Sequence, residues 1–189
     1  LQQLESQSPW IIFGTAGLPQ APLTAVVGTR SQSETGRSIA GQIASSVEGM
    51  VSGGAFGIDL EAHKQAKLKS IPQIMVLAGG LDRVYPNQAA EFIKAGFIGA
   101  AISEMPPGVS SGKLGYLNRN RLIAAICQRL YLIEAPVVSG SINTAQVALN
   151  LKKDVTVCVS NDPEFSPGGL WFGKKPGVRT ELFDELAIS

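Results

Sequence analysis

Three short turns rich in serine and glycine could bind phosphate. Each turn follows a short apolar run and precedes a helical pattern, and the turns are Gly28-Thr29-Arg30, Ser52-Gly53-Gly54 and Ser139-Gly140-Ser141. A strand that leads into a helix leaves the first backbone N–H groups of that helix without partners, and these groups suit anions, above all phosphates. We therefore expect the three turns to lie at one edge of a sheet and to form a phosphate-binding rim.

The first turn does not carry the fingerprint of a dinucleotide-binding loop. The second and third glycines of GxGxxG are missing after Gly28, and no acidic residue stands clearly at the end of the next strand to hold a ribose. NAD binding is therefore disfavoured and no cofactor is expected. Arg30 follows a strand, where its guanidinium could bind a phosphate through two hydrogen bonds or could simply be a surface residue at a tight turn.

The third turn gives the sharpest signal for an anion site. Hydroxyl groups at Ser139, Ser141 and Thr144 surround the first residues of the predicted helix. Ordinary capping of the helix by a serine accounts for one of these hydroxyls and leaves the others unexplained. Small residues and hydroxyls at a helix start are the residues that an anion site requires.

A second source of positive charge is the run Asn118-Arg119-Asn120-Arg121, which follows a Gly/Ser loop that carries Lys113. Two arginines at the start of a helix oppose the helix dipole, which favours acidic side chains there. This placement favours a polyanionic ligand over a solvated helix start. A pair between Arg121 and either Glu104 or Glu134 would instead make that arginine structural.

The second turn leads into a helix with Asp59 and, one turn later, His63, which is the only histidine in the chain. Residues at this spacing lie on the same face of a helix. A catalytic Asp–His pair would need a nucleophile, and no serine or cysteine nearby carries the nucleophile-elbow pattern. We therefore expect a structural hydrogen-bonded pair that holds the loop.

The elements that position these residues alternate between strands and helices from Leu23 onward. Strands are expected at 24–28, 50–52, 73–77, 99–103, 129–134 and 155–159. Helices are expected at 33–48, 58–69, 88–95, 119–127 and 141–152. This alternation implies right-handed crossovers, and therefore an α/β fold with a mostly parallel sheet and helices on both faces.

The predicted organisation is one domain with two less regular ends. Residues 1–22 form a lead-in segment, 23–160 form the body, and 161–189 form a loop and a short helix near 180–187 that belong to the same domain. One long irregular segment, 105–117, interrupts the body. The lead-in and the tail could pair as an extra edge of the sheet or could cover a partner surface, and the sequence leaves both open.

Composition limits the classes of function. With 189 residues, 44% of them hydrophobic and 16% charged, the chain is globular and large enough for a real core. The net charge of +1 excludes a uniformly basic surface, so any nucleic acid must bind a local patch. Two cysteines cannot form a zinc site alone, and we expect no metal site and two buried, reduced thiols. No apolar run approaches the roughly 20 residues of a membrane span, and no signal-peptide pattern is present, which favours a cytoplasmic protein without membrane contact.

Six motifs in this order resemble the DprA/Smf family, the DNA-processing protein A family. They are Val27-Gly28-Thr29-Arg30; Val51 to Asp59 with Ala62-His63; Val76 to Asp82 with Tyr85-Pro86; Ser103-Glu104 with Pro106 and Gly108; Arg119-Asn120-Arg121 with Ile123-Ala124; and Glu134-Ala135 with Ser139-Gly140-Ser141 and Thr144-Ala145. The resemblance runs from about Gly28 to Val159. It implies an extended Rossmann-like domain that binds single-stranded DNA without catalysis, acts as a homodimer, and protects incoming DNA and loads RecA-type recombinase onto it in natural transformation.

The resemblance also implies which residues line the DNA groove. These are Gly28, Thr29, Arg30, Ser52, Gly53, Gly54, Arg119, Asn120, Arg121, Ser139, Gly140, Ser141 and Thr144, with Lys113 as a looser candidate. Asp59, His63, Glu104 and Glu134 would support the groove. The family has Phe-Pro before the arginine run where this chain has Leu117-Asn118, so an aromatic that could stack on a base is missing there, and Tyr116 is the candidate replacement. After the last strand this chain has Ser160-Asn161-Asp162-Pro163 where the family has Pro-Gly, and the Gly-rich stretch that follows matches the family loosely. The resemblance places the dimer and recombinase contacts near 180–187.

Two other classes of function remain open at this point. Lonely-Guy-type phosphoribohydrolases share the scaffold and use carboxylates at the same edge of the sheet, where Glu104 and Glu134 could act as acid and base. Their Pro-Gly-Gly-x-Gly-Thr run is absent, and Val138 to Thr144 stands in its place. The other class is a sensor domain that binds a nucleotide without turning it over.

Overall fold

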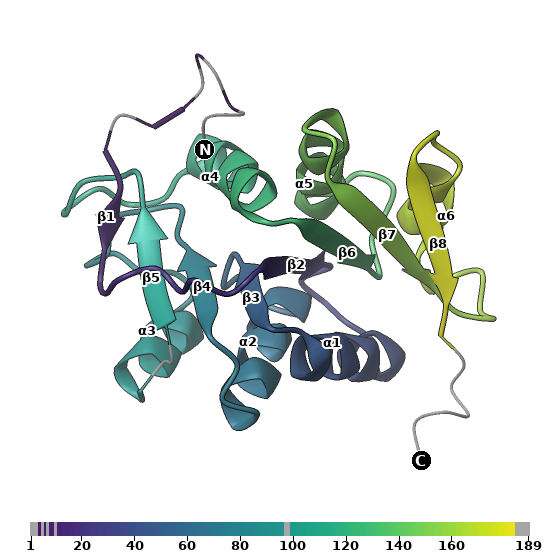
Figure 1. The fold of residues 1–189 in the computed structure, drawn as a ribbon, viewed down its shortest axis with the longest axis horizontal. Coiled ribbons are helices and arrows are strands. Elements are labelled where there is room, and N and C mark those ends of the chain that lie inside the picture. The colour runs from purple at the N-terminus through teal and green to yellow at the C-terminus, as the bar shows by residue number, and fades with distance from the viewer. Residues whose placement is uncertain (1–3, 5, 7, 10, 97–98, 184–189) are drawn as a thin grey trace.

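Short runs of small and β-branched residues form the strands of one eight-stranded sheet in the part of the chain that the structure describes (Figure 1). The structure is a computed structural model, and it describes all residues except 1–3, 5, 7, 10, 97–98 and 184–189. The strands are β1 Phe13–Gly14, β2 Leu23–Gly28, β3 Gly49–Ser52, β4 Gln73–Val76, β5 Gly99–Ser103, β6 Arg129–Ile133, β7 Asp154–Val159 and β8 Val178–Leu182. The helices are α1 Glu34–Ser46, α2 Ile58–Leu68, α3 Asn87–Lys94, α4 Lys113–Ile126, α5 Gly140–Asn150 and α6 Pro167–Gly173.

The strand order is β1-β5-β4-β3-β2-β6-β7-β8, so later strands are added to the sheet on both sides of β2. The chain runs first through β3, β4 and β5 on one side, and then returns to place β6 against the free edge of β2, with Thr24 opposite Arg129 and Gly28 opposite Ile133. All neighbouring strands are parallel except β1, which is antiparallel to β5. This arrangement confirms the predicted α/β class and is a Rossmann-like fold.

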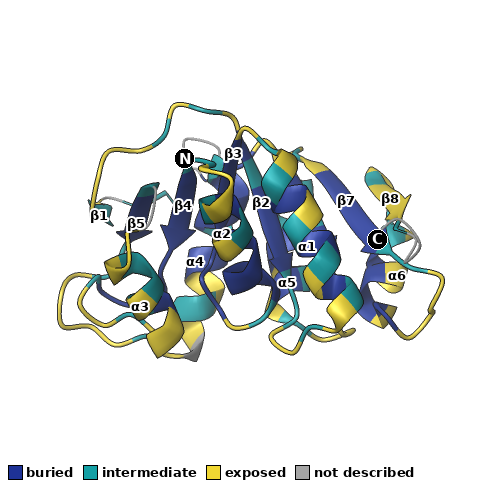
Figure 2. Cartoon of the chain, turned by 90° about the horizontal axis from the view of Figure 1, so that it is seen from below, coloured by how far each residue is buried: buried dark blue, intermediate teal, exposed yellow. Residues whose placement is uncertain are grey.

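Helices cover both faces of the sheet because the strand side chains alternate in direction (Figures 1 and 2). Val27 on β2 packs in the cluster that holds Leu122 of α4 and Ala145 of α5. Its neighbour Val26 packs on the opposite face with Ile39 of α1 and with residues of α2. A helix on each face leaves only the ends of the strands open to a ligand.

The helix that carries the arginine run begins earlier than expected, at Lys113 instead of Arg119. Gly115 makes this possible, because a Cβ atom there would lie 2.7 Å from the carbonyl oxygen of Ala78. Gly115, which looks like a loop residue in the sequence, therefore serves a close contact between α4 and the loop after β4. Arg119 and Arg121 consequently lie in the second and third turns of α4, and the argument from the dipole at a helix start does not apply to them.

The two ends of the chain add strands at opposite edges of the sheet. β1 extends the β5 edge, and β8 extends the β7 edge with Val155 opposite Val178 and Val159 opposite Leu182. The helix expected at 180–187 is wrong for residues 180–182, because the ladder to β7 draws them into β8; residues 184–189 lie outside the described part. The tail also contains α6, which begins with a proline at its first position, where no N–H is needed.

Two further expectations concern buried and membrane-spanning segments. Cys127 and Cys158 are both buried and free, as expected. Within the described residues, no helix combines the length and the apolar character that a membrane span requires.

Candidate functional site

A pocket of about 610 Å³ lies between the loops that follow β2 and β6, where the order in which strands are added to the sheet changes direction. We call it the switch-point pocket, because ligands of open α/β sheets bind at this topological position. Its walls come from the β2 loop, the start of α2, one face of α4 and the start of α5. The lining residues are Val27, Gly28, Thr29, Arg30, Ala55, Asp59, Tyr116, Leu117, Arg119, Asn120, Ile123, Pro136, Val138, Ser139, Gly140, Ser141 and Thr144.

The start of α5 brings an open helix N-terminus to this pocket. Ser139 caps the helix, since its Oγ accepts a hydrogen bond from the N–H of Ile142 at 3.2 Å, and it lies 2.9 Å from the Oγ of Ser141. The backbone N–H groups of Gly140 and Ser141 have no partner among the described residues. The Thr144 hydroxyl donates to the Gly140 carbonyl at 3.0 Å, so it stabilises the helix. This end of α5 can accept an anion.

The start of α1, which the first turn precedes, already holds an anion of the protein itself. The Glu134 carboxylate accepts hydrogen bonds from the Ser33 N–H at 2.8 and 2.9 Å and from the Ser33 hydroxyl at 3.0 Å. Gly36 leaves room for this carboxylate, because a Cβ there would lie 2.0 Å from Glu134 Oε2. Partial burial raises the pKa of Glu134, and the hydrogen bonds from Ser33 oppose that rise. Glu134 does not line the switch-point pocket.

The second turn lies beneath the pocket and also has internal partners. The Ser52 hydroxyl donates to the Val26 carbonyl at 2.6 Å, and the Gly53 N–H donates to the Asp59 carboxylate at 3.2 Å. Ser52, Gly53 and Gly54 are all buried and do not line the pocket. The turn before α5 therefore presents unused N–H groups to the pocket, whereas the second turn does not.

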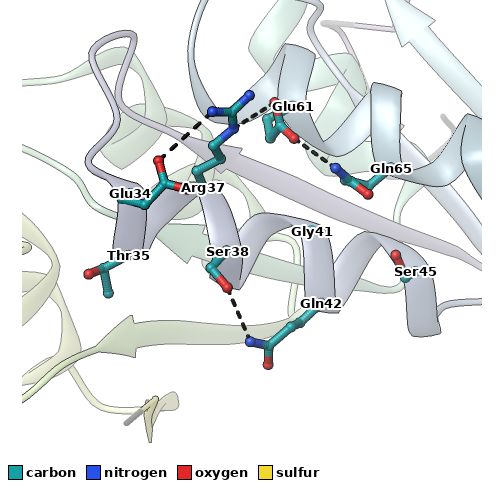
Figure 3. Close-up of a pocket in the computed structure, with 9 residues that line it drawn as sticks. All are labelled: Glu34, Thr35, Arg37, Ser38, Gly41, Gln42, Ser45, Glu61 and Gln65. Atoms are coloured by element: carbon teal, nitrogen blue, oxygen red, sulfur yellow. Dashed lines mark hydrogen bonds and ion pairs between the residues drawn. The ribbon is translucent and has the colours of Figure 1, made fainter. Parts of the chain in front are cut away.

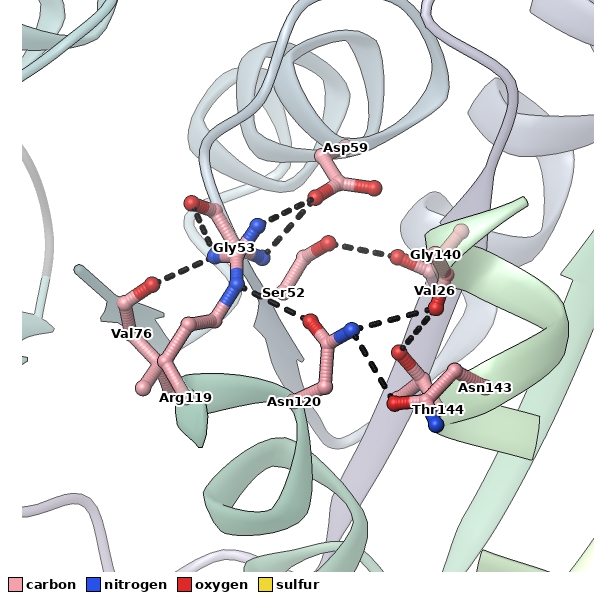
Figure 4. A network of polar contacts seen from close by, with 10 residues as sticks. All are labelled: Val26, Ser52, Gly53, Asp59, Val76, Arg119, Asn120, Gly140, Asn143 and Thr144. Atoms are coloured by element: carbon pink, nitrogen blue, oxygen red, sulfur yellow. Dashed lines mark hydrogen bonds and ion pairs between the residues drawn. The ribbon is translucent and has the colours of Figure 1, made fainter. Parts of the chain in front are cut away.

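Arg119 ties these loops together in a buried polar network (Figure 4). Its Nη1 donates to the carbonyls of Gly53 and Val76, the latter at 2.6 Å, and its Nη2 lies 3.7 Å from the Asp59 carboxylate. The Arg119 side chain is only 7% exposed. Burial lowers the pKa of Arg119 and raises that of Asp59, and the attraction between the two charges opposes both shifts. Arg119 thus forms part of the pocket floor while its donors are used by the protein.

Asn120 and Arg121 extend from α4 to different neighbours. The Asn120 side chain accepts from Arg119 Nε at 3.1 Å and donates to the Gly140 carbonyl at 3.1 Å, so it fixes the start of α5 (Figure 4). Arg121 forms a 2.5 Å ion pair with Glu104 and does not line the pocket. Of the two roles left open for Arg121, the structure shows the pairing with Glu104. Lys113 begins α4, and its side chain lies outside what the structure describes.

Asp59 and His63, which the sequence predicts to be a structural hydrogen-bonded pair, contact different neighbours in the structure. Nδ1 of His63 lies 2.6 Å from the side-chain amide of Gln73 on β4, whereas the Asp59 carboxylate contacts Gly53 and Arg119. His63 is completely buried, and burial lowers its pKa to about 4. The imidazole is therefore neutral at pH 7 and serves the packing of α2 on the sheet.

Arg30 and three apolar side chains form the outer part of the pocket. The Arg30 guanidinium lies 5.0 Å from the ring centre of Tyr116, and no carboxylate pairs with it among the described residues. Leu117 is 42% exposed and Val138 is 93% exposed. The sequence points to Tyr116, and the resemblance to the family draws attention to position 117, but Val138 is a single apolar residue in a loop and gives no signal; Leu117 itself lies in α4, which begins earlier than the sequence predicts.

A second hollow, of about 760 Å³, lies between α1 and α2 (Figure 3). Its polar side chains pair with one another: Arg37 lies 3.5 Å from Glu61, Gln65 donates to Glu61 at 2.9 Å, and Gln42 donates to Ser38 at 3.4 Å. None of the residues that the sequence singles out lines it. The switch-point pocket is therefore the candidate site.

Comparison with known proteins gives a consistent family. The model of the family described as DNA recombination-mediator protein A matches residues 1–171. A putative DNA processing protein DprA of Mycobacterium tuberculosis is 38% identical over 157 residues, which are 78% of this chain and 40% of that protein. The chain thus spans about two fifths of the length of this relative.

Two solved structures share the fold. DNA processing protein A of Streptococcus pneumoniae superposes with a TM-score of 0.82 at 28% identity, over 94% of this chain and 69% of that one. DNA processing protein A of Helicobacter pylori, described for its single-stranded DNA binding mode, superposes with a TM-score of 0.81 at 24% identity, over 91% of this chain and 82% of that one.

Proposed function

The chain belongs to the DNA recombination-mediator protein A family, and we propose on that basis that its switch-point pocket binds single-stranded DNA. The proposal rests on three features that meet in this pocket: an open helix N-terminus, an arginine without a carboxylate partner among the described residues, and a largely apolar wall. The first two features suit a phosphate, and the third suits a base.

The phosphate would lie between the start of α5 and the β2 loop. The free N–H groups of Gly140 and Ser141 and the hydroxyls of Ser139 and Ser141 supply donors, and Arg30 supplies a charge. Helix N-termini and guanidinium groups are common phosphate ligands, and neither reads sequence. The binding is therefore expected to tolerate any base sequence.

The base would contact the apolar outer part of the pocket, made by Tyr116, Leu117 and Val138. In a duplex the faces of the bases are stacked on one another, whereas in a single strand they are free to stack on protein side chains. Tyr116 is already held in place, since Arg30 lies over its ring and the Ser111 hydroxyl donates to its oxygen at 3.2 Å. This preference for free bases favours single-stranded over double-stranded DNA.

The site supports binding and not turnover of a nucleotide. The two carboxylates that an enzyme of the Lonely-Guy type would use are engaged elsewhere, Glu134 with Ser33 and Glu104 with Arg121. Neither lines the switch-point pocket. A nucleotide sensor would share the phosphate contacts, and a competition between a mononucleotide and an oligonucleotide separates the two functions.

The larger role proposed for the protein follows from the family resemblance. We propose that it acts as a homodimer, protects incoming single strands and passes them to a RecA-type recombinase. The proposal would fail if the chain, mixed with a recombinase and single-stranded DNA, did not speed filament formation on the DNA.

The test of DNA binding uses Arg30→Ala with Arg179→Ala as the matched control. Arg179 is also an exposed arginine, but it lies on β8 and pairs with Asp154 at 3.4 Å. Fluorescence anisotropy of a labelled oligothymidylate should show weaker binding by Arg30→Ala alone, and a slope of log K against log salt that is smaller by about 0.7. Equal affinity of the two variants, or a preference for duplex, would refute the assignment.

A further inference from the structure

Another hollow, distinct from the one between α1 and α2, lies next to the switch-point pocket at the same edge of the sheet. It has a volume of about 620 Å³ and is formed by the loop after β4, by α3 and by the segment before α4. Its lining includes Arg83, Tyr85, Lys94, Ser111 and Tyr116. We call it the α3 hollow. Tyr116 lines both cavities, so its side chain is the boundary between them.

An exposed aromatic pair brings Tyr85 of the α3 hollow against Phe56, whose chain neighbour Ala55 lines the switch-point pocket. The rings of Phe56 and Tyr85 meet edge to face with their centres 6.2 Å apart, and they are 37% and 58% exposed. Phe56 follows Ala55, which lines the switch-point pocket, and precedes Gly57, where a Cβ would lie only 2.7 Å from Arg30 Cα. The chain segment that carries Phe56 therefore lies against the backbone of Arg30, while Tyr85 lines the α3 hollow.

The charges of the α3 hollow suit a polyanion. Arg83 and Lys94 both line it, and the Arg83 side chain is 57% exposed. Asp82 also lines the hollow, but its carboxylate accepts the Gly108 N–H at 2.8 and 3.0 Å and lies 3.7 Å from the Arg83 guanidinium, so the two cations leave an excess of positive charge. Two cations and exposed aromatic faces are the two components of a sequence-tolerant single-strand site.

We propose that a bound strand continues from the switch-point pocket past Tyr116 into the α3 hollow, where a base stacks on the Phe56–Tyr85 pair and Arg83 binds a phosphate. This inference rests on the proposed function, and it identifies the ligand as a polynucleotide, since a mononucleotide fills only one of the two cavities. Affinity should consequently grow with the length of the strand until both cavities are filled.

The test removes the aromatic faces and keeps an apolar side chain, with Phe56→Leu, Tyr85→Leu and the double variant. An oligothymidylate of about 16 nucleotides, at the upper end of single-strand site sizes, serves as the probe. Each single variant should bind it roughly 5- to 100-fold more weakly, whereas Tyr85→Phe should keep its affinity. Trp171→Leu is the matched control, because Trp171 is 51% exposed but lies on α6.

Photocrosslinking gives a direct readout that does not depend on the variants. An oligothymidylate that carries 5-iodouracil should crosslink to the peptide that holds Phe56 or Tyr85 in the unsubstituted protein. If Tyr85→Leu fails to fold, as judged by circular dichroism, Phe56→Leu and the crosslink decide the result.

The two proposals fail in distinguishable ways. The second subsite is overturned if the double variant keeps its affinity or if the crosslinks are confined to the switch-point pocket. The first site is unaffected by those results as long as Arg30→Ala loses binding. Absence of binding to the unsubstituted protein overturns the proposed function and the subsite together.

Discussion

Replacing Arg119 by methionine tests whether this residue is a structural tie or a DNA contact. The change removes the donor for the buried carbonyls of Gly53 and Val76 and the counter-charge of Asp59. An unsatisfied buried carbonyl costs about 1–3 kcal/mol, and a broken buried ion pair about 3–5 kcal/mol. Because Asp59 has a raised pKa and can take up a proton, the carbonyls dominate, and we expect a loss of about 3–5 kcal/mol.

Urea denaturation at pH 7 measures this loss, together with the denaturant slope that shows whether unfolding stays two-state. Asp59→Asn should cost a similar amount, and the double variant should lose at least about 1 kcal/mol less than the sum of the single variants, since they share one interaction. Arg179→Met, with a side chain 66% exposed, should change stability by less than about 1 kcal/mol. A stable Arg119→Met protein that has lost DNA binding would refute the structural role. If this variant does not fold, Arg119→Lys takes its place, because lysine keeps the charge and lacks the planar guanidinium group.

Two further predictions concern stability. The pKa of His63, about 4, lies below its usual 6.5, so between pH 6.5 and 4 the unfolded chain binds a proton that the native protein does not bind. The free energy of unfolding should therefore fall by about 3 kcal/mol as the pH drops from 6.5 to 4. Urea titrations measure this fall, and a His63→Gln protein with the same pH dependence would contradict the prediction. Gly28→Ala would place a Cβ 2.1 Å from the Ile133 carbonyl oxygen and should lower the free energy of unfolding by about 1–3 kcal/mol or more. Gly17→Ala is the control, because a Cβ there would have nothing within 4 Å and should leave the stability nearly unchanged. Similar thermal midpoints for the two variants would disprove the close contact.

The alternation of strands and helices could be predicted from the sequence because buried parallel strands are short apolar runs between amphipathic helices. The expected strands at 24–28, 99–103 and 155–159 lie within or coincide with β2, β5 and β7. The start of α4 could not be predicted, because Gly112 and Gly115 look like loop residues until the carbonyl of Ala78 is known to lie against one of them. The strand β8 could not be predicted because four of its five residues are exposed, so it lacks the apolar run of a buried strand.

The candidate site could be predicted in part. The Ser139 turn and Arg30 both line the switch-point pocket. A helix start has the same sequence pattern whether its anion is a ligand or a side chain of the same protein. Ser33 and its partner Glu134 lie 101 positions apart, so no local pattern shows that the start of α1 is already occupied.

The pairing of β2 with β6 has a consequence for the order of events during synthesis. The two strands that flank the switch-point pocket join Gly28 to Ile133, and α5 follows only at Gly140. Contacts between such distant segments close late, because the loop between them must be ordered first. A chain still emerging from the ribosome can thus build β2 to β5 with their helices while it has no pocket. We expect a nascent protein to remain unable to hold DNA until α5 has been made.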